Sequence, residues 1–152
     1  MNFWKELIHN EMLITASLAW LIAQIAKTII HAFVTKDLNL ERMYGSGGMP
    51  SCHSATVTAL ATSACFLHGP GSSEFALATI LAIIVMYDAR GVRRETGIQA
   101  KVINDINELL TKHSKITPPE KELKELIGHT PLQVLAGALL GFAIAFIVHS
   151  VF

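Results

Sequence analysis

The sequence is poor in charged residues, and its charges favour neither sign. Asp, Glu, Lys and Arg make up 16% of the 152 residues, against roughly a quarter in an average soluble protein. Twelve basic residues balance twelve acidic ones. This excludes a highly charged disordered chain and a globally basic nucleic-acid binder, so we expect no nucleic-acid partner. Cysteine is also scarce, and two cysteines cannot form a disulfide-rich scaffold.

Apolar residues make up 51% of the chain, and they are gathered into runs. The runs 12–34 and 132–152 can each cross a bilayer, since residues 12–34 would form a helix of about 34 Å and a hydrocarbon core is about 30 Å thick. Two shorter runs, 54–67 and 75–87, lie between them and are predicted to cross as well. We therefore predict an all-α integral-membrane helical bundle with about four transmembrane spans plus short amphipathic or surface helices.

The basic residues are unevenly distributed over the two sides that four spans define. One side holds the N-terminal segment, the turn Gly69–Gly71 and the C-terminal end, and it carries Lys5. Lys27 lies in the first run, and the other side carries Lys36, Arg42, Arg90, Arg93, Arg94, Lys101, Lys112, Lys115, Lys121 and Lys124. Because cytoplasmic loops carry an excess of Lys and Arg, we predict a multi-pass protein of the cell membrane whose basic side faces the cytoplasm.

Three further patterns concern the packing of the helices. Apolar residues recur at helical spacing from Ile98 to Leu110, which predicts an amphipathic helix on the membrane surface or against the bundle. A capping-box pattern predicts a short helix over residues 117–128. Gly137 and Gly141 form a Gly-x-x-x-Gly pattern, which predicts close helix packing within the bundle, with a homodimer as the alternative. We expect one domain that covers residues 1–152.

Polar residues gather at the basic ends of the predicted spans, where the cost of burying them in a membrane points to function. His53 and His129 begin the second and fourth spans, whereas Lys27 lies near the end of the first and Asp88 at the end of the third. Histidine can attack phosphorus or protonate a leaving oxygen. Arginine side chains and helix N-termini bind phosphate. The combination therefore favours phosphoester chemistry.

Three segments at this end resemble a known family. Residues 47–54 (Gly-Gly-Met-Pro-Ser-Cys-His-Ser), 88–94 (Asp-Ala-Arg-Gly-Val-Arg-Arg) and 128–131 (Gly-His-Thr-Pro) look like the divergent, small-membrane-protein branch of the type-2 phosphatidic acid phosphatase superfamily. That superfamily also contains bacterial acid phosphatases and vanadium haloperoxidases. The resemblance implies hydrolysis of phosphate monoesters on an all-helical bundle, without a metal or other cofactor, through a phosphohistidine.

The same resemblance implies a role for individual residues. His129 is similar to the family's nucleophilic histidine, and His53 to the histidine that acts as general acid. Ser51 is the implied phosphate contact, beside cations from the first and third motifs. The predicted substrate-binding residues are Lys27, Arg42, Gly47, Gly48, Ser51, Asp88, Arg93 and Arg94, with either Arg93 or Arg94 as the arginine of the third motif.

The chain departs from the family pattern at two informative positions. Cys52 replaces the usual glycine before the acid histidine, and Gln133 stands where the family has an acid four residues after the nucleophile. Glutamine can hydrogen-bond an imidazole, but it cannot stabilise imidazolium charge as a carboxylate does. Asp88 could take that part from the third span.

We predict a membrane phosphatase that hydrolyses a lipid phosphate monoester of the phosphatidic acid, phosphatidylglycerol phosphate or prenyl phosphate type. Its partners would be this substrate and the surrounding membrane lipids. One alternative is a non-catalytic membrane protein that binds or transports anionic lipid headgroups, and another is a lipid-phosphate transferase. A zinc site from Cys52, His53 and His129 is disfavoured, because adjacent residues chelate one ion poorly and no familiar ligand spacing occurs.

Overall fold

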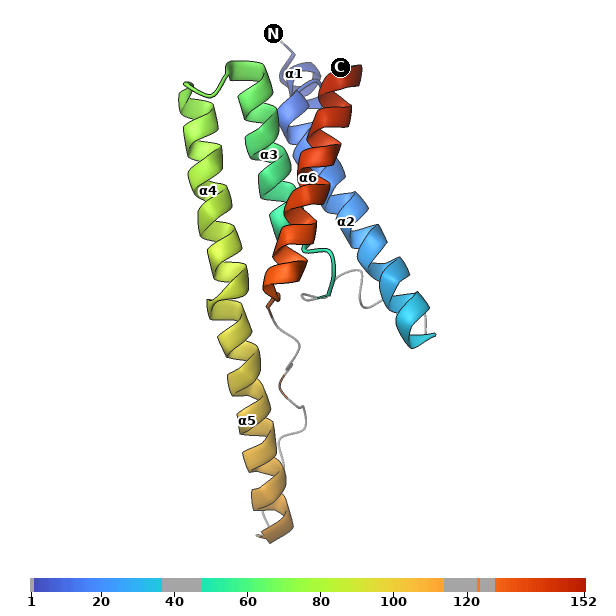
Figure 1. Ribbon diagram of the computed structural model, residues 1–152, viewed down its shortest axis with the longest axis vertical. Coiled ribbons are helices and arrows are strands. Elements are labelled where there is room, and N and C mark those ends of the chain that lie inside the picture. Colours follow the sequence, from blue (N-terminus) through green and yellow to red (C-terminus); the bar gives the residue numbers. More distant parts are fainter. Residues whose placement is uncertain (1, 37–47, 114–122, 124–127) are drawn as a thin grey trace.

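The computed structural model of the chain describes residues 2–36, 48–113, 123 and 128–152. Over these residues it contains six α-helices and no strand (Figure 1). The predicted all-α fold is therefore confirmed. The helices are α1 (Phe3–Ile8), α2 (Glu11–Thr35), α3 (Cys52–His68), α4 (Ser73–Arg90), α5 (Val92–His113) and α6 (Pro131–Val151).

The four predicted spans correspond to α2, α3, α4 and α6. Three described helical stretches are long and apolar enough to cross a membrane, namely Glu11–Thr35, Ser73–Lys112 and Pro131–Val151. The remaining span, α3, has 17 residues, and it packs against α2, α4 and α6. Its burial among three apolar helices explains why so short a helix belongs to the membrane bundle.

Small side chains allow the helices around α3 to approach closely. The core where α2, α3 and α6 meet consists mainly of alanines, namely Ala19, Ala23, Ala55, Ala59 and Ala145. In membranes, helices associate by van der Waals packing, which small residues favour because they let backbones come together. The alanines therefore hold α3 at the centre of the bundle.

The Gly-x-x-x-Gly pattern of α6 lies at this contact. A Cβ atom on Gly137 would overlap the carbonyl oxygen of Ser51, and a Cβ atom on Gly141 would overlap that of Ala55. The two glycines thus let α6 lie directly against the backbone of α3, which confirms the predicted packing within the bundle. The homodimer stays a prediction.

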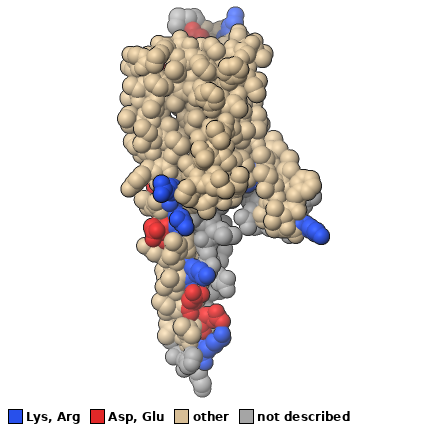
Figure 2. Space-filling model, in the orientation of Figure 1, with Lys and Arg blue, Asp and Glu red and all other residues tan. Residues whose placement is uncertain are grey.

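The two ends of the bundle differ in polarity. The N-terminal helix α1, the turn between α3 and α4 and the end of α6 lie together at one end (Figure 1). Most of the Lys, Arg, Asp and Glu side chains visible in Figure 2 lie at the opposite end and along α5. The charges are therefore segregated as the sequence predicted.

The predicted amphipathic helix is present as α5, but it does not fold against the bundle. Over the described residues, α5 continues beyond the bundle along the line of α4 instead of folding back onto it (Figure 1). The reason is local, because the N–H of Gly91 donates a helical hydrogen bond to the carbonyl of Tyr87 at 2.8 Å and so keeps the helical course at the junction. The short helix predicted over residues 117–128 lies outside the described residues, apart from Leu123 and Gly128.

Candidate active site

The two predicted catalytic histidines face each other at the charged end of the bundle. His53 lies in the first turn of α3, and His129 lies just before α6. The centroids of their rings are 5.9 Å apart, and the ring planes are inclined by 60°. His129 is almost fully buried, with 3% of its surface exposed, whereas His53 is half-buried.

Backbone hydrogen bonds fix the two histidines relative to each other. The N–H of Ser51 donates to the carbonyl of Gln133 at 3.1 Å, which ties the start of α3 to the start of α6. The N–H of His129 donates to the carbonyl of Ala89 at 2.9 Å, which ties it to the end of α4. Three segments that are far apart in the sequence thus meet at one site.

Gly128 permits the last of these contacts. Its φ of +91° lies in the left-handed region, and a Cβ atom there would overlap the backbone of Arg94. Both features require glycine. Gly128 was predicted only as part of a motif and as the end of a short helix, although a glycine two residues before a helix N-cap is compatible with such a turn.

A single atom of Gln133 links the cap of α6 to His129. The side-chain oxygen Oε1 accepts a hydrogen bond from the N–H of Thr130 at 3.0 Å, and the Thr130 hydroxyl accepts one from the N–H of Gln133 at 3.3 Å. This reciprocal pair is a capping box. The same Oε1 lies 3.3 Å from Nδ1 of His129. Because an amide oxygen only accepts, Nδ1 carries the proton and Nε2 keeps its lone pair.

The surroundings also keep His129 uncharged. Burial lowers the pKa of His129 below its ordinary value of 6.5. The nearby His53, Lys27 and Arg93 lower this pKa further, whereas the hydrogen bond that His129 donates to Gln133 raises it. His129 is therefore neutral at neutral pH, which is the protonation state that a nucleophile requires.

Lys27 brings a buried cation to the site. Its side chain is 3% exposed, and its charge acts on both imidazoles. Its Cγ and Cδ atoms would lie 3.1 Å from a Cβ atom on Gly48, whose φ is +87°. The bare backbone of Gly48 thus lies against the stem of Lys27, and the structure brings together these two predicted residues.

Arg93 and Asp88 form an ion pair at the edge of the site. Nε of Arg93 donates to Oδ2 of Asp88 at 2.7 Å, and both side chains are a little under half exposed. The charge of Arg93 acts on both imidazoles, and that of Asp88 acts on His53. Arg94 differs from Arg93, because its contact with the site is through its backbone, which packs on Gly128.

These contacts show how Arg93 differs from Arg94 and how Gln133 differs from Asp88. Arg93 is the arginine whose charge acts on both histidines. Gln133 is the residue that contacts Nδ1 of His129, while Asp88 binds Arg93. The sequence shows that Gln133 follows His129 by four residues, but it could not show which side chain contacts the imidazole.

Ser51 has a structural role that was not predicted from the sequence. Its hydroxyl oxygen caps α3 by accepting hydrogen bonds from the N–H and the hydroxyl of Ser54, at 3.3 and 3.0 Å. Both bonds use lone pairs of that oxygen, and the side chain is fully buried. The phosphate contact of Ser51 stays a prediction. The next residue, Cys52, is buried with its Sγ 3.8 Å from Nδ1 of His53.

Two predicted site residues, Arg42 and Gly47, lie outside the described residues. Within the described part of the chain, no three His, Cys, Asp or Glu side chains form a group that could hold a metal ion. The described site thus consists of two imidazoles, a buried lysine, an arginine–aspartate pair and glycine backbone.

Comparison with known proteins extends over most of the chain. A family described as "Divergent PAP2 family" matches residues 8–144. The chain is also similar to a protein of Bacillus subtilis (strain 168) named "Uncharacterized membrane protein YuiD". The two are 40% identical over 151 residues, and the alignment covers 93% of this chain and 96% of the relative. No solved structure matches the chain.

Proposed function

The chain belongs to the divergent PAP2 family, and on that premise we propose that it is a membrane phosphatase acting on a lipid phosphate monoester. The observation that carries the proposal is the pair of imidazoles at the cationic end, with ring centroids 5.9 Å apart. Since reacting atoms approach to about 3–3.5 Å before reaction, both rings are within reach of one phosphate group.

In the first step His129 acts as the nucleophile. Nε2 attacks phosphorus, the bond between phosphorus and the ester oxygen breaks, and His53 donates a proton to the leaving alkoxide. The contact between Nδ1 and Gln133 supports this assignment, because it leaves the Nε2 lone pair free. The product is an alcohol and a phosphohistidine on His129.

In the second step water completes the reaction. His53, now neutral, takes a proton from water while the water oxygen attacks phosphorus and the bond to Nε2 of His129 breaks. Inorganic phosphate leaves, and both histidines return to their starting protonation states. One proton moves out and one moves back over the cycle, so His53 acts first as acid and then as base.

The cations bind the phosphate and stabilise the charge that develops on it. Lys27 contributes a charge in a buried place, where electrostatic interactions are stronger than in water. Arg93 contributes a planar guanidinium that Asp88 holds at 2.7 Å. The backbone of Gly48 and the N-terminus of α3 add N–H donors. Arg42, Gly47 and Ser51 remain predicted contacts.

The substrate would be a phospholipid or prenyl phosphate whose phosphate is a monoester. The site lies at one end of apolar helices, which favours an amphiphile over a soluble phosphate. On the positive-inside rule this end faces the cytoplasm of the cell, which favours lipid biosynthesis over recycling on the outer face.

Phosphate release from the solubilised protein tests the proposal. We expect turnover of at least one of phosphatidic acid, phosphatidylglycerol phosphate and a prenyl phosphate, undiminished by chelator. His129→Asn should reduce turnover to background and leave no acid-labile phosphoenzyme. His53→Asn should reduce kcat by about 10²–10⁴-fold, the usual contribution of a general acid. His68→Asn, at the other end of α3, is the matched control and should retain full activity.

Full activity of His129→Asn would show that the phosphohistidine mechanism is wrong. A lack of turnover on every lipid phosphate, together with saturable lipid binding, would support the second candidate, a non-catalytic protein for anionic headgroups. The specific observation in its favour is Gln133, because an amide cannot neutralise the charge of a phosphorylated imidazole. Phosphate transfer to added alcohols would identify a transferase instead.

A further inference from the structure

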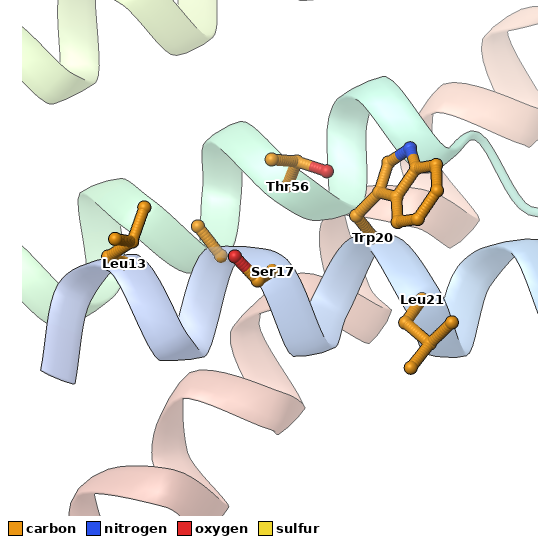
Figure 3. A pocket seen from close by; sticks show the side chains of 6 residues that line it. Leu13, Ser17, Trp20, Leu21 and Thr56 are labelled. Carbon is orange, nitrogen blue, oxygen red and sulfur yellow. The ribbon is translucent and has the colours of Figure 1, made fainter. Parts of the chain in front are cut away.

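An apolar groove runs along the outside of the bundle between α2 and α3. It is lined by Leu13, Ala16, Ser17, Trp20 and Leu21 of α2 and by Thr56 of α3 (Figure 3). Its volume is about 520 Å³, which lies within the range of about 300–1,000 Å³ typical of small-molecule sites. The groove is large enough for a hydrocarbon chain.

The groove ends close to the candidate active site. Thr56 follows His53 by three residues, or about 4.5 Å of helix rise. On α2, Leu13, Trp20 and Lys27 follow one another at intervals of seven residues and therefore lie on nearly the same face. Lys27 lies about 10 Å beyond Trp20 along the helix. The floor of the groove thus continues towards the buried cation of the site.

The groove itself offers little for a polar ligand. Four of its lining side chains are apolar, and the hydroxyl of Thr56 donates within its own helix to the carbonyl of Cys52 at 2.8 Å. Ser17 is small and exposed, so its position leaves space that a larger residue would fill. An apolar groove with cations beyond one end is complementary to an amphiphile with an anionic head.

We propose that this groove binds the hydrocarbon chain of a single-chain phosphate monoester whose phosphate lies beside Lys27. The inference rests on the proposed function for the position of the phosphate, but binding alone can test it. A lipid with another headgroup could fill the groove, yet only an anionic head would also be attracted by the positive charge of Lys27. The groove therefore determines which chain lengths the site accepts.

Trp20 provides a reporter inside the groove. The chain has two tryptophans, and Trp4 lies in α1 at the opposite end of the bundle with 73% of its surface exposed. Trp4→Phe leaves Trp20 as the only indole. The probe is hexadecyl phosphate brominated on its chain, added to this variant in a bromine-free detergent, because bromine quenches tryptophan fluorescence at contact.

We expect saturable quenching that unbrominated hexadecyl phosphate reverses and hexadecanol does not. Ser17→Phe should raise the half-saturating concentration about tenfold. One or two methylene contacts in an apolar pocket have an effect of this size. Ser17→Val should have a smaller effect in the same direction. Ile22→Phe, on an exposed face of α2 away from the groove, should bind as the parent does.

Non-saturable quenching, equal quenching by brominated hexadecanol, or unchanged binding by both Ser17 variants would overturn the proposal. Measurements of hydrolysis distinguish a failure of the groove proposal from a failure of the proposed phosphatase function. Ser17→Phe should lower kcat/KM for hexadecyl phosphate about tenfold and leave that for butyl phosphate unchanged, which also shows that the variant folds. Saturable binding without hydrolysis would contradict the proposed phosphatase activity and support chain binding in the groove. Hydrolysis of both substrates with no effect of Ser17→Phe on either would support the phosphatase and contradict chain binding in the groove.

Discussion

The side chain of Gln133 both caps α6 and contacts the imidazole of His129. Its Oε1 accepts from the N–H of Thr130 and from Nδ1 of His129, so the capping box and the imidazole share one acceptor. An amide fixes the tautomer of the ring as a carboxylate would, but it adds no negative charge. This agrees with the lowered pKa of His129, which burial causes first and the neighbouring cations reinforce.

The substitution Gln133→Glu should therefore change the pH dependence of turnover. Glutamate preserves the capping box, and a carboxylate this close to an imidazole raises its pKa by about 1–3 units. In the parent protein His129 loses its neutral form only below pH 6.5, so the acidic limb of kcat/KM should lie below that pH. In Gln133→Glu the limb should move to higher pH. The measurement is the pH profile of kcat/KM on one lipid phosphate.

Gln99→Glu, on exposed α5, makes the same change of charge away from the imidazole and serves as the control. Its profile should match that of the parent protein. An unmoved limb in Gln133→Glu, or an equal shift in both variants, would show that Gln133 does not set the charge state of His129.

At the scale of helices, the site depends on how closely α3 and α6 approach. Gly137 lies against the backbone of Ser51, two residues before His53, while Gln133 one turn earlier on α6 binds the N–H of Ser51. Glycine packing and the backbone hydrogen bonds of Ser51 and His129 thus together position the two imidazoles.

Gly137→Ala should separate α3 from α6. The added methyl group would overlap the Ser51 carbonyl oxygen, and overpacking of this kind costs about 1–3 kcal/mol. We expect a lower free energy of unfolding in detergent. We also expect a lower kcat, because the separation of the two imidazoles would change. Gly71→Ala is the matched control, since a Cβ atom there meets no neighbour within 4 Å. Equal stability of the two variants would contradict the proposed role of Gly137.

The sequence predicted the helices well and their directions less well. Hydropathy and the caps at Ser72 and Thr130 mark where α4 and α6 begin, because both signals are local. The direction of α5 could not be predicted, since amphipathic spacing is the same whether a helix folds back or continues. The sequence could not show that the charge of Arg93 acts on both imidazoles, because adjacent residues on a helix point about 100° apart.

At the scale of the whole molecule, one end of the protein and the adjoining α5 carry most of the charged side chains visible in Figure 2, and the other end carries few. The turn before Ser73 lies at the second end, and α5 extends from the first (Figure 1). If the positive-inside rule holds here, the site opens to the cytoplasm. Sidedness is independent of the catalytic proposal and can be measured separately.

Cysteine labelling should reveal this orientation. In a background with Cys52→Ala and Cys65→Ala, a membrane-impermeant maleimide should label Ser73→Cys in intact cells. It should label Lys112→Cys only after the cells are lysed. Ser73 and Lys112 are both exposed, so access from the surrounding water decides the result. The opposite pattern would place the site on the outer face.

The shortness of α3 has a consequence for which headgroups can reach the histidines. Its 17 residues span about 25 Å, some 5 Å less than a hydrocarbon core of about 30 Å. Its end at the turn to α4 is level with the ends of its neighbours, whereas α2 continues past its other end (Figure 1). If α3 spans the hydrocarbon core, we expect the imidazoles to lie below the plane of the headgroups. A small phosphate group can reach that depth with part of its hydration shell, whereas a bulky diester headgroup would lose more of its hydration, so under the proposed function we expect depth to favour monoesters.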